Sequence, residues 1–210
     1  IMTSSAAGYD KIQNLILNPK IGFELKMPYV TKGFSVSGYA AFDYALRSEK
    51  RFTKPWDAYS YDKTTDTYNN QKASTAISSV TQDEFLSNEN TYFFKAAYDR
   101  QFDKHEVNAF LGYEQTTNIN KRTTAYRRDL LSDQLDQIFT GSTVAQDANG
   151  FEYQDGRESY LGRVAYNYDG KYFAEVSARY NGSFNFPTEN RWGMFPALSL
   201  GWKISNEDFF

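Results

Sequence analysis

The charged side chains of this 210-residue chain that could do chemistry recur at alternate positions within apolar segments. Those expected to share one face are Lys95, Asp99, Glu114, Arg163, Glu175 and Arg179. Asp99 and Glu114 could act as general acid and base only in a cleft that shifted their pKa values in opposite directions. The wall of a water-filled channel also carries such charges, so we interpret the six residues as lumen-lining rather than catalytic.

Histidine and cysteine offer little further chemistry. His105 is the single histidine, and it lies beside a predicted turn without the partners of a catalytic triad or a metal site. The absence of cysteine excludes a disulfide framework and a thiolate metal site. We therefore expect no catalytic residue, no metal ligand and no cofactor, and we do not expect an enzyme.

Composition narrows the class of protein. The chain contains 17 Tyr and 17 Phe, yet its mean hydropathy is below zero, so the rings alternate with polar residues. No run reaches the ~20 apolar residues of a membrane-spanning helix, whereas a transmembrane β-strand needs only ~9–11 residues of alternating character. The net charge of −3 argues against a nucleic-acid surface, which would show clustered Lys and Arg.

The elements that position these side chains are strands, and the clearest signal is a hairpin around Asp169 and Gly170. Asp-Gly suits a two-residue primed turn, because both central residues need a positive φ. On either side of it, apolar residues such as Val164 and Val176 alternate with polar ones. Successive side chains of a strand point to opposite faces, so this hairpin has one apolar face and one wet face.

The same period of two predicts seven strands, at 20–29, 33–47, 91–102, 105–119, 157–168, 171–182 and 194–205. Short turns at 30–32, 103–104 and 169–170 alternate with polar loops, the longest of which are 48–90 and 120–156. Tight turns at one end and long loops at the other are typical of outer-membrane barrels, whose long loops are extracellular. In the second long loop, the spacing of Leu130, Leu135 and Ile138 predicts a short helix over 127–139.

We therefore expect an all-β fold, an antiparallel transmembrane β-barrel segment of about seven strands from a larger closed barrel. An open sheet leaves unpaired backbone groups at its two edges, and each costs several kcal/mol in hydrocarbon, so the barrel must close. Residues 1–210 would therefore form part of a single barrel domain. An eight-stranded small barrel would need one more strand at 11–18, where the alternating pattern is weak.

Aromatic residues sort by depth along the predicted strands. One row would lie near the short turns and contains Tyr29, Phe34, Phe102, Tyr168, Tyr172 and Trp202. A second row would lie near the long loops and contains Tyr44, Tyr92, Tyr113, Tyr160 and Tyr180. We interpret the rows as two girdles at the membrane interfaces. Arg100 falls on the apolar face close to a short turn, where an interfacial Arg costs only ~0–1 kcal/mol.

Several of these residues form recognisable motifs. The stretch 98–105, Tyr-Asp-Arg-Gln-Phe-Asp-Lys-His, followed by Gly112 and Glu114, resembles a hairpin of the SusC/RagA-type TonB-linked outer-membrane transporters of Bacteroidota. The later half is similar in order and spacing at 162–163, 166–172, 179–183, 190–196 and 199–202. The residue before Gly182-Ser183 is usually Asp in that family and is Asn181 here.

The resemblance implies a bacterial outer-membrane barrel, surrounded by lipid and plugged by a globular domain, that imports bulky nutrients such as oligosaccharides or peptides. It also implies energy supplied by TonB and a SusD-type surface lipoprotein that acts as a lid over the long loops. Neither the plug nor the TonB-binding segment is found in the sequence, so we expect an internal piece of the barrel. Nothing in the family's pattern implies nucleic acid as a partner.

Two other functions fit the same pattern. A non-transport outer-membrane barrel could use the wet wall as a pore, adhesin or assembly scaffold. A secreted β-sandwich could instead bind carbohydrate through its Tyr and Trp residues. Sequence upstream of this segment would separate the first from a transporter, and solubility without detergent would favour the second.

Overall fold

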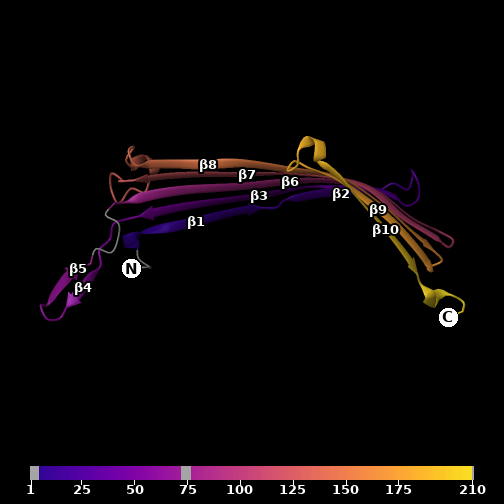
Figure 1. The fold of residues 1–210 in the computed structure, drawn as a ribbon, viewed down its shortest axis with the longest axis horizontal. Helices are drawn as coiled ribbons and strands as arrows, with labels where there is room; N and C mark the ends of the chain where they lie inside the picture. The colour runs from indigo at the N-terminus through magenta and orange to yellow at the C-terminus, as the bar shows by residue number, and fades with distance from the viewer. Residues whose placement is uncertain (1–4, 72–76, 210) are drawn as a thin grey trace. The chain divides into compact units, whose positions relative to one another are not determined.

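A computed structural model describes residues 5–71 and 77–209 of the chain, and its main feature is one eight-stranded sheet (Figure 1). The strands are β1 (Gly8–Leu17), β2 (Lys20–Lys26), β3 (Phe34–Thr53), β6 (Ser79–Phe102), β7 (His105–Arg128), β8 (Gln146–Tyr168), β9 (Tyr172–Ser183) and β10 (Trp192–Trp202). Their order is β1-β3-β6-β7-β8-β9-β10, with β2 also paired to β3. A separate hairpin joins β4 (Tyr59–Asp62) to β5 (Thr67–Asn70).

The seven predicted strands are confirmed. The segment 11–18, whose alternation is weak, lies almost entirely within an additional strand, β1. Both β1 and β2 pair with β3, and Pro19 lies between them. Proline has no N–H to give to the sheet, so it interrupts the ladder, while its carbonyl still accepts a bond of 3.0 Å from the Phe42 N–H. The interruption turns one long edge into two shorter strands.

The strands run further than the hydropathy pattern predicts. β6 and β7 each have 24 residues, and β8 has 23. Strand therefore replaces part of both expected loops, at 48–53, 79–90, 120–128 and 146–156. These extensions carry polar residues on both faces, so the alternation that marks a half-buried strand is missing from them.

The helix predicted over 127–139 is wrong. β7 continues to Arg128, Asp129 turns the chain with a φ of 59°, and Leu130 then bridges to Gly141. Helical structure among the described residues of this segment is a single 3-10 turn, Ile138–Thr140. Packing of Leu130 into a buried cluster overrides the helical spacing of the leucines.

The turn at Asp169 and Gly170 has the predicted chemistry. Asp169 and Gly170 have φ values of 55° and 64°, as a primed turn requires. The Asn167 side-chain oxygen accepts a hydrogen bond of 3.1 Å from the Gly170 N–H. Lys104, in the neighbouring turn, forms an ion pair of 2.9 Å with Asp169.

The described residues divide into two compact units. The first unit contains 5–16, 44–71, 77–87 and 120–153, and its small core is Phe52, Val80 and Leu130, with Tyr9 and Ile138 packed against them. The second unit contains 17–43, 88–119 and 154–209. None of the helical turns among the described residues is long or apolar enough to cross a membrane.

Candidate functional site

The second unit has an apolar face that is open to its surroundings. The register places Val164 opposite Val176, and Val176 opposite Leu198, so all three lie on the same face of β8, β9 and β10. The exposed fractions are 72% for Leu111, 70% for Leu198 and 75% for Leu200. A contiguous apolar face of this kind is unfavourable in water and indicates contact with another apolar phase.

Aromatic rows border this apolar face. Near the end of β8 that leads to the short turn, Tyr168 pairs with Tyr172, and Tyr172 pairs with Trp202. Eight residues along the strand, Tyr160 pairs with Tyr180, and the Tyr180 ring stacks on Trp192 with centroids 4.8 Å apart. At ~3.3 Å per residue the rows are about 26 Å apart along the strand, close to the ~25 Å apolar band of outer-membrane barrels.

The remaining predicted girdle residues lie at strand ends, within strands or in a turn. The Tyr113 ring lies 5.2 Å from the Tyr160 ring, and the Tyr92 ring lies edge-on to Phe42 at 6.0 Å. Phe34 begins β3, Phe102 ends β6, Tyr44 lies within β3, and Tyr29 lies in the preceding turn, where it is exposed. A girdle at a lipid interface remains a prediction for all eleven residues.

Arg100 lies among rings on this face. Its guanidinium donates a hydrogen bond of 3.3 Å to the Tyr98 hydroxyl and lies 5.9 Å from the centre of the Phe102 ring. Phe102 is the last residue of β6, so the ring contact lies at the turn end of the strand, where an interfacial Arg is least costly.

The opposite face of the second unit carries paired charges. Arg163 forms an ion pair of 2.7 Å with Glu175 and donates a second bond of 3.3 Å to the Asn108 side chain. Asn108 in turn donates to Asp99. Arg163, Glu175 and Asn108 border a hollow of about 280 Å³ that Glu106 and Asn167 also line. The carboxylates face cations or amides, so they suit a hydrated wall better than proton transfer.

The predicted lumen-lining residues therefore join in two groups. Arg179 forms an ion pair of 2.9 Å with Glu114, while Arg163 and Glu175 form the other pair. Asp99 and Glu114, weighed above as an acid and base, bind different partners. Lys95 lies on the Asp99 side of β6 by alternation and joins neither pair. That these six residues line a lumen stays a prediction.

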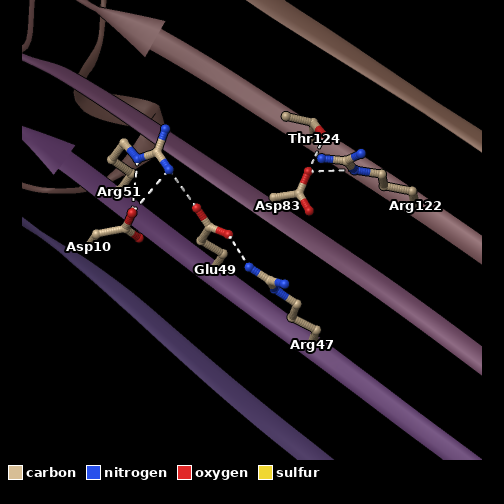
Figure 2. Close-up of polar contacts among 7 residues, drawn as sticks. All are labelled: Asp10, Arg47, Glu49, Arg51, Asp83, Arg122 and Thr124. Carbon is tan, nitrogen blue, oxygen red and sulfur yellow. Dashed lines mark hydrogen bonds and ion pairs between the residues drawn. The ribbon is translucent and has the colours of Figure 1, made fainter.

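The first unit has a charged face that the sequence analysis missed, because most of its residues were assigned to loops (Figure 2). Arg47 ended a predicted strand, and Asp10 preceded the first one. Arg51 contacts Asp10 at 3.0 Å and Glu49 at 2.9 Å, and Glu49 also binds Arg47 at 2.9 Å. On the neighbouring strands, Asp83 accepts bonds from Arg122 at 2.8 Å and Thr124 at 2.5 Å. The alternation of acids and bases across four strands was the signal that could have found them.

A second polar cluster in the first unit holds the segment that follows β7. Asp136 accepts a hydrogen bond from the Tyr9 hydroxyl and forms an ion pair of 3.1 Å with Lys50. The hydrogen bond from Tyr9, followed by that from Lys50, lowers the pKa of Asp136 below its usual range. Beneath this cluster lie Phe52 and Val80, which are 3% and 0% exposed.

Comparison with known proteins agrees with this geometry. No family model matches the chain. It is 47% identical over 51 residues to the TonB-dependent receptor SusC of Bacteroides thetaiotaomicron, covering 24% of the chain and 5% of that receptor. It is 31% identical over 132 residues to the TonB-dependent receptor P39 of Formosa agariphila, covering 60% of the chain and 12% of the relative.

Solved structures show the same fold. The structure of the RagAB peptide transporter matches with a TM-score of 0.82 and 18% identity. The match covers 95% of the present chain and 21% of the matched transporter chain. In sequence and fold the chain resembles a fragment of a SusC/RagA-type TonB-linked receptor. It spans between 5% and 12% of the length of the curated relatives it matches. The relatives named here are receptors and a transporter rather than enzymes.

The chain also has a polar anchor at its short-turn end that the sequence analysis missed. Glu207, just after β10, accepts hydrogen bonds from Tyr172 at 2.6 Å, Trp202 at 3.0 Å and Lys171 at 3.1 Å. These donors, with Tyr172 the largest cause, lower the pKa of Glu207 to about 2. The anchor fixes two rings of the predicted girdle by their polar ends.

The single histidine, His105, begins β7 directly after the 103–104 turn. Its Nδ1 is 2.6 Å from the Tyr166 hydroxyl, and its ring contacts Phe102 and Tyr168 with centroids 5.8 and 5.1 Å apart. Within 5–71 and 77–209, no group of His, Cys, Asp and Glu side chains could hold a metal ion. The local packing gives His105 an aromatic, structural setting.

Proposed function

We propose that the chain forms part of the wall of an outer-membrane, TonB-dependent importer of bulky nutrients, either oligosaccharides or peptides. The observation that carries this proposal is the second unit, where an exposed apolar face backs directly onto a face of paired charges. A strand that alternates in this way separates hydrocarbon on one side from a water-filled lumen on the other. The named relatives, which are TonB-dependent receptors and a peptide transporter, support the same reading.

The apolar face of the second unit would contact the lipid of the bacterial outer membrane. The first unit suits water instead, because its core is covered by the 129–141 segment and its other face is charged. We therefore propose that the first unit lies in water, outside the membrane on the extracellular side. The turns at 103–104 and 169–170 would then be periplasmic.

The β4–β5 hairpin is the best candidate in this chain for contact with a partner at the cell surface. It exposes Tyr59, Tyr61 and Tyr68, with exposed fractions of 60%, 48% and 72%. Tyr is favoured at protein interfaces, because its ring offers apolar area and its hydroxyl offers a hydrogen bond. We propose that this hairpin, together with the 129–145 connection, meets a SusD-type surface lipoprotein that closes over the barrel.

Energy for import would come from TonB, acting through a plug and a TonB-binding segment of the whole receptor. Uptake of labelled oligosaccharides and labelled peptides by the native bacterium, with and without its TonB, tests the proposal. We expect uptake of one class that requires both the receptor and TonB. Uptake that persists without TonB would indicate a passive pore and would overturn the energised mechanism.

The lipoprotein contact needs a separate test. Deleting 59–70 from the full receptor should reduce co-purification of the lipoprotein, whereas the full receptor with Tyr153→Phe should behave as wild type. Unchanged lipoprotein association and unchanged uptake after the deletion would refute a lid contact at this hairpin.

A further inference from the structure

A second hollow on the charged side of the second unit has a different character from the first. It has a volume of about 420 Å³ and lies where β8, β9 and the start of β10 meet. Its polar lining includes Arg157, Arg179, Arg191, Asn181, Ser183 and Asn190. Every charged side chain in this lining is an arginine, in a protein whose net charge is −3.

The backbone brings two of these arginines together from distant parts of the sequence. Arg157 pairs with Ser183 in the register between β8 and β9. The Ser183 N–H in turn donates a hydrogen bond of 3.2 Å to the Arg191 carbonyl. Arg157 and Arg191 thus lie on either side of Ser183. The contacts between β8, the end of β9 and the residue before β10 fix the backbone positions of both arginines.

Arg179 and Arg191 are neutralised unequally. Arg179 is engaged by Glu114 at 2.9 Å, Ser159 at 3.1 Å and Asn181 at 2.7 Å. The Arg191 guanidinium lies 4.8 Å from the centre of the Phe184 ring, and its Nε is buried without a hydrogen-bond partner among the described residues. A buried N–H that lacks an acceptor is costly, so this atom calls for an acceptor from outside the described structure.

We propose that this hollow, the arginine hollow, binds a carboxylate group of the transported solute. Guanidinium groups present N–H donors in a planar fork that matches a carboxylate, and the flanking Asn and Ser side chains can complete its hydrogen bonding. The inference rests on the proposed import function, and it narrows the solute to an acidic one. Uronic-acid oligosaccharides and acidic peptides share this chemistry.

Binding by the purified full-length receptor tests the arginine hollow directly. The probes are trigalacturonate with its neutral methyl ester, and triglutamate with triglutamine, each measured by calorimetry at low and high salt. We expect the acid of one pair to bind more tightly than its neutral partner, and to weaken as salt screens the charges. The pair that shows this difference identifies the solute as saccharide or peptide.

Substitutions locate the binding. Arg157→Gln and Arg191→Gln should each weaken binding of the acidic probe about tenfold, the scale of one charged hydrogen bond. Arg157→Lys should recover part of the loss, because it restores the charge without the fork. Glu114→Gln should strengthen binding by releasing Arg179. Lys26→Gln, which removes a charge from β2 in the same unit, is the matched control and should change nothing.

Three results would overturn the arginine hollow: equal binding of acidic and neutral probes, no binding of either acid, or full affinity in both glutamine variants. Failure of the import function is a separate result, because it appears as uptake that does not depend on TonB in the wild-type receptor. Should Arg191→Gln fail to fold, Arg157→Gln and Glu114→Gln still test the proposal, since the Arg157 side chain is exposed and that of Glu114 is partly exposed.

Discussion

Arg179 on β9 reaches across β8 to form an ion pair with Glu114 on β7, with 2.9 Å between Nη2 and Oε1. On the way the same nitrogen donates a hydrogen bond of 3.1 Å to Ser159 on β8. A single guanidinium therefore links three neighbouring strands. Such a contact excludes a slip of the register by one residue, because that slip would move a side chain to the opposite face.

The first prediction concerns this pair. Both side chains are partly exposed, at 49% and 31%, so we expect a coupling free energy of only ~0.2–1 kcal/mol. A double-mutant cycle with Arg179→Gln and Glu114→Gln, followed by urea unfolding of the full receptor in lipid vesicles, measures the coupling. A value of several kcal/mol would contradict this expectation and indicate a pair far less hydrated than the structure shows.

The second prediction uses two adjacent residues on opposite faces of β10. Leu198 is 70% exposed on the apolar face and pairs with Val176, whereas Ser199 pairs with Glu175 on the charged face. Leu198→Arg should destabilise the folded barrel by ~2–4 kcal/mol if Leu198 lies near the bilayer midplane. Ser199→Arg should cost much less, because it places the charge beside a carboxylate.

Unfolding in lipid vesicles, together with the heat-dependent gel mobility of folded barrels, gives both values for the second prediction. Equal costs for the two substitutions would show that the apolar face does not meet lipid. A larger cost for Ser199→Arg would reverse the assignment of the two faces.

How much of this fold could be predicted depends on what lies on each side of a strand. In the second unit, Val164, Val176 and Leu198 alternate with charged residues, because one face is apolar and the other is wet, so the strands were found to within a few residues. In the extensions, both faces are polar. Asp83 and Arg122 therefore looked like loop residues, although their ion pair belongs to a regular ladder.

The candidate site was only partly accessible for a similar reason. Alternation placed Arg163 and Glu175 on one face, but which charge pairs with which depends on registers between distant strands. The helix expected around Leu130 fails because its helical spacing competes with a buried site formed by Phe52 and Val80, which lie far away in the sequence. Arg191 lies in the 190–196 motif, but nothing local marked it as a site residue. Only the pairing of β8 with β9 and the hydrogen bond from Ser183 bring it to Arg157.

The third prediction tests the core of the first unit. Phe52 is 3% exposed and packs with Val80, Leu130 and the Tyr9 ring, whose centroid is 5.7 Å away. Phe52→Ala should cost ~3–5 kcal/mol locally and release the segment that covers it, because the cavity cannot close fully. Limited proteolysis within 129–141 should become faster. Val144→Ala, at a side chain that is 94% exposed, is the control and should leave cleavage unchanged.

The fourth prediction concerns the acid side of the pH scale and the anchor at Glu207. Three donors hold the pKa of Glu207 at about 2, below its ordinary value of 4.5. A carboxyl group with a lowered pKa stabilises the fold fully above its ordinary pKa, and this contribution is lost as the pH falls through the lowered value. Protonation should therefore weaken the hydrogen bond from the Trp202 indole between pH 4.5 and about 2.

The fluorescence of Trp202 reports this change in the full receptor, as the difference between wild type and Trp202→Phe. We expect a transition centred near pH 2, and we expect Glu207→Gln to remove it while the ring stays in place. The matched control is Asp208→Asn, because Asp208 is fully exposed and lies 3.8 Å from Lys171 without contacting the indole. A transition near pH 4.5, the ordinary pKa of a Glu side chain, would show that the three donors do not hold the carboxylate. The short-turn end would then lack its polar anchor.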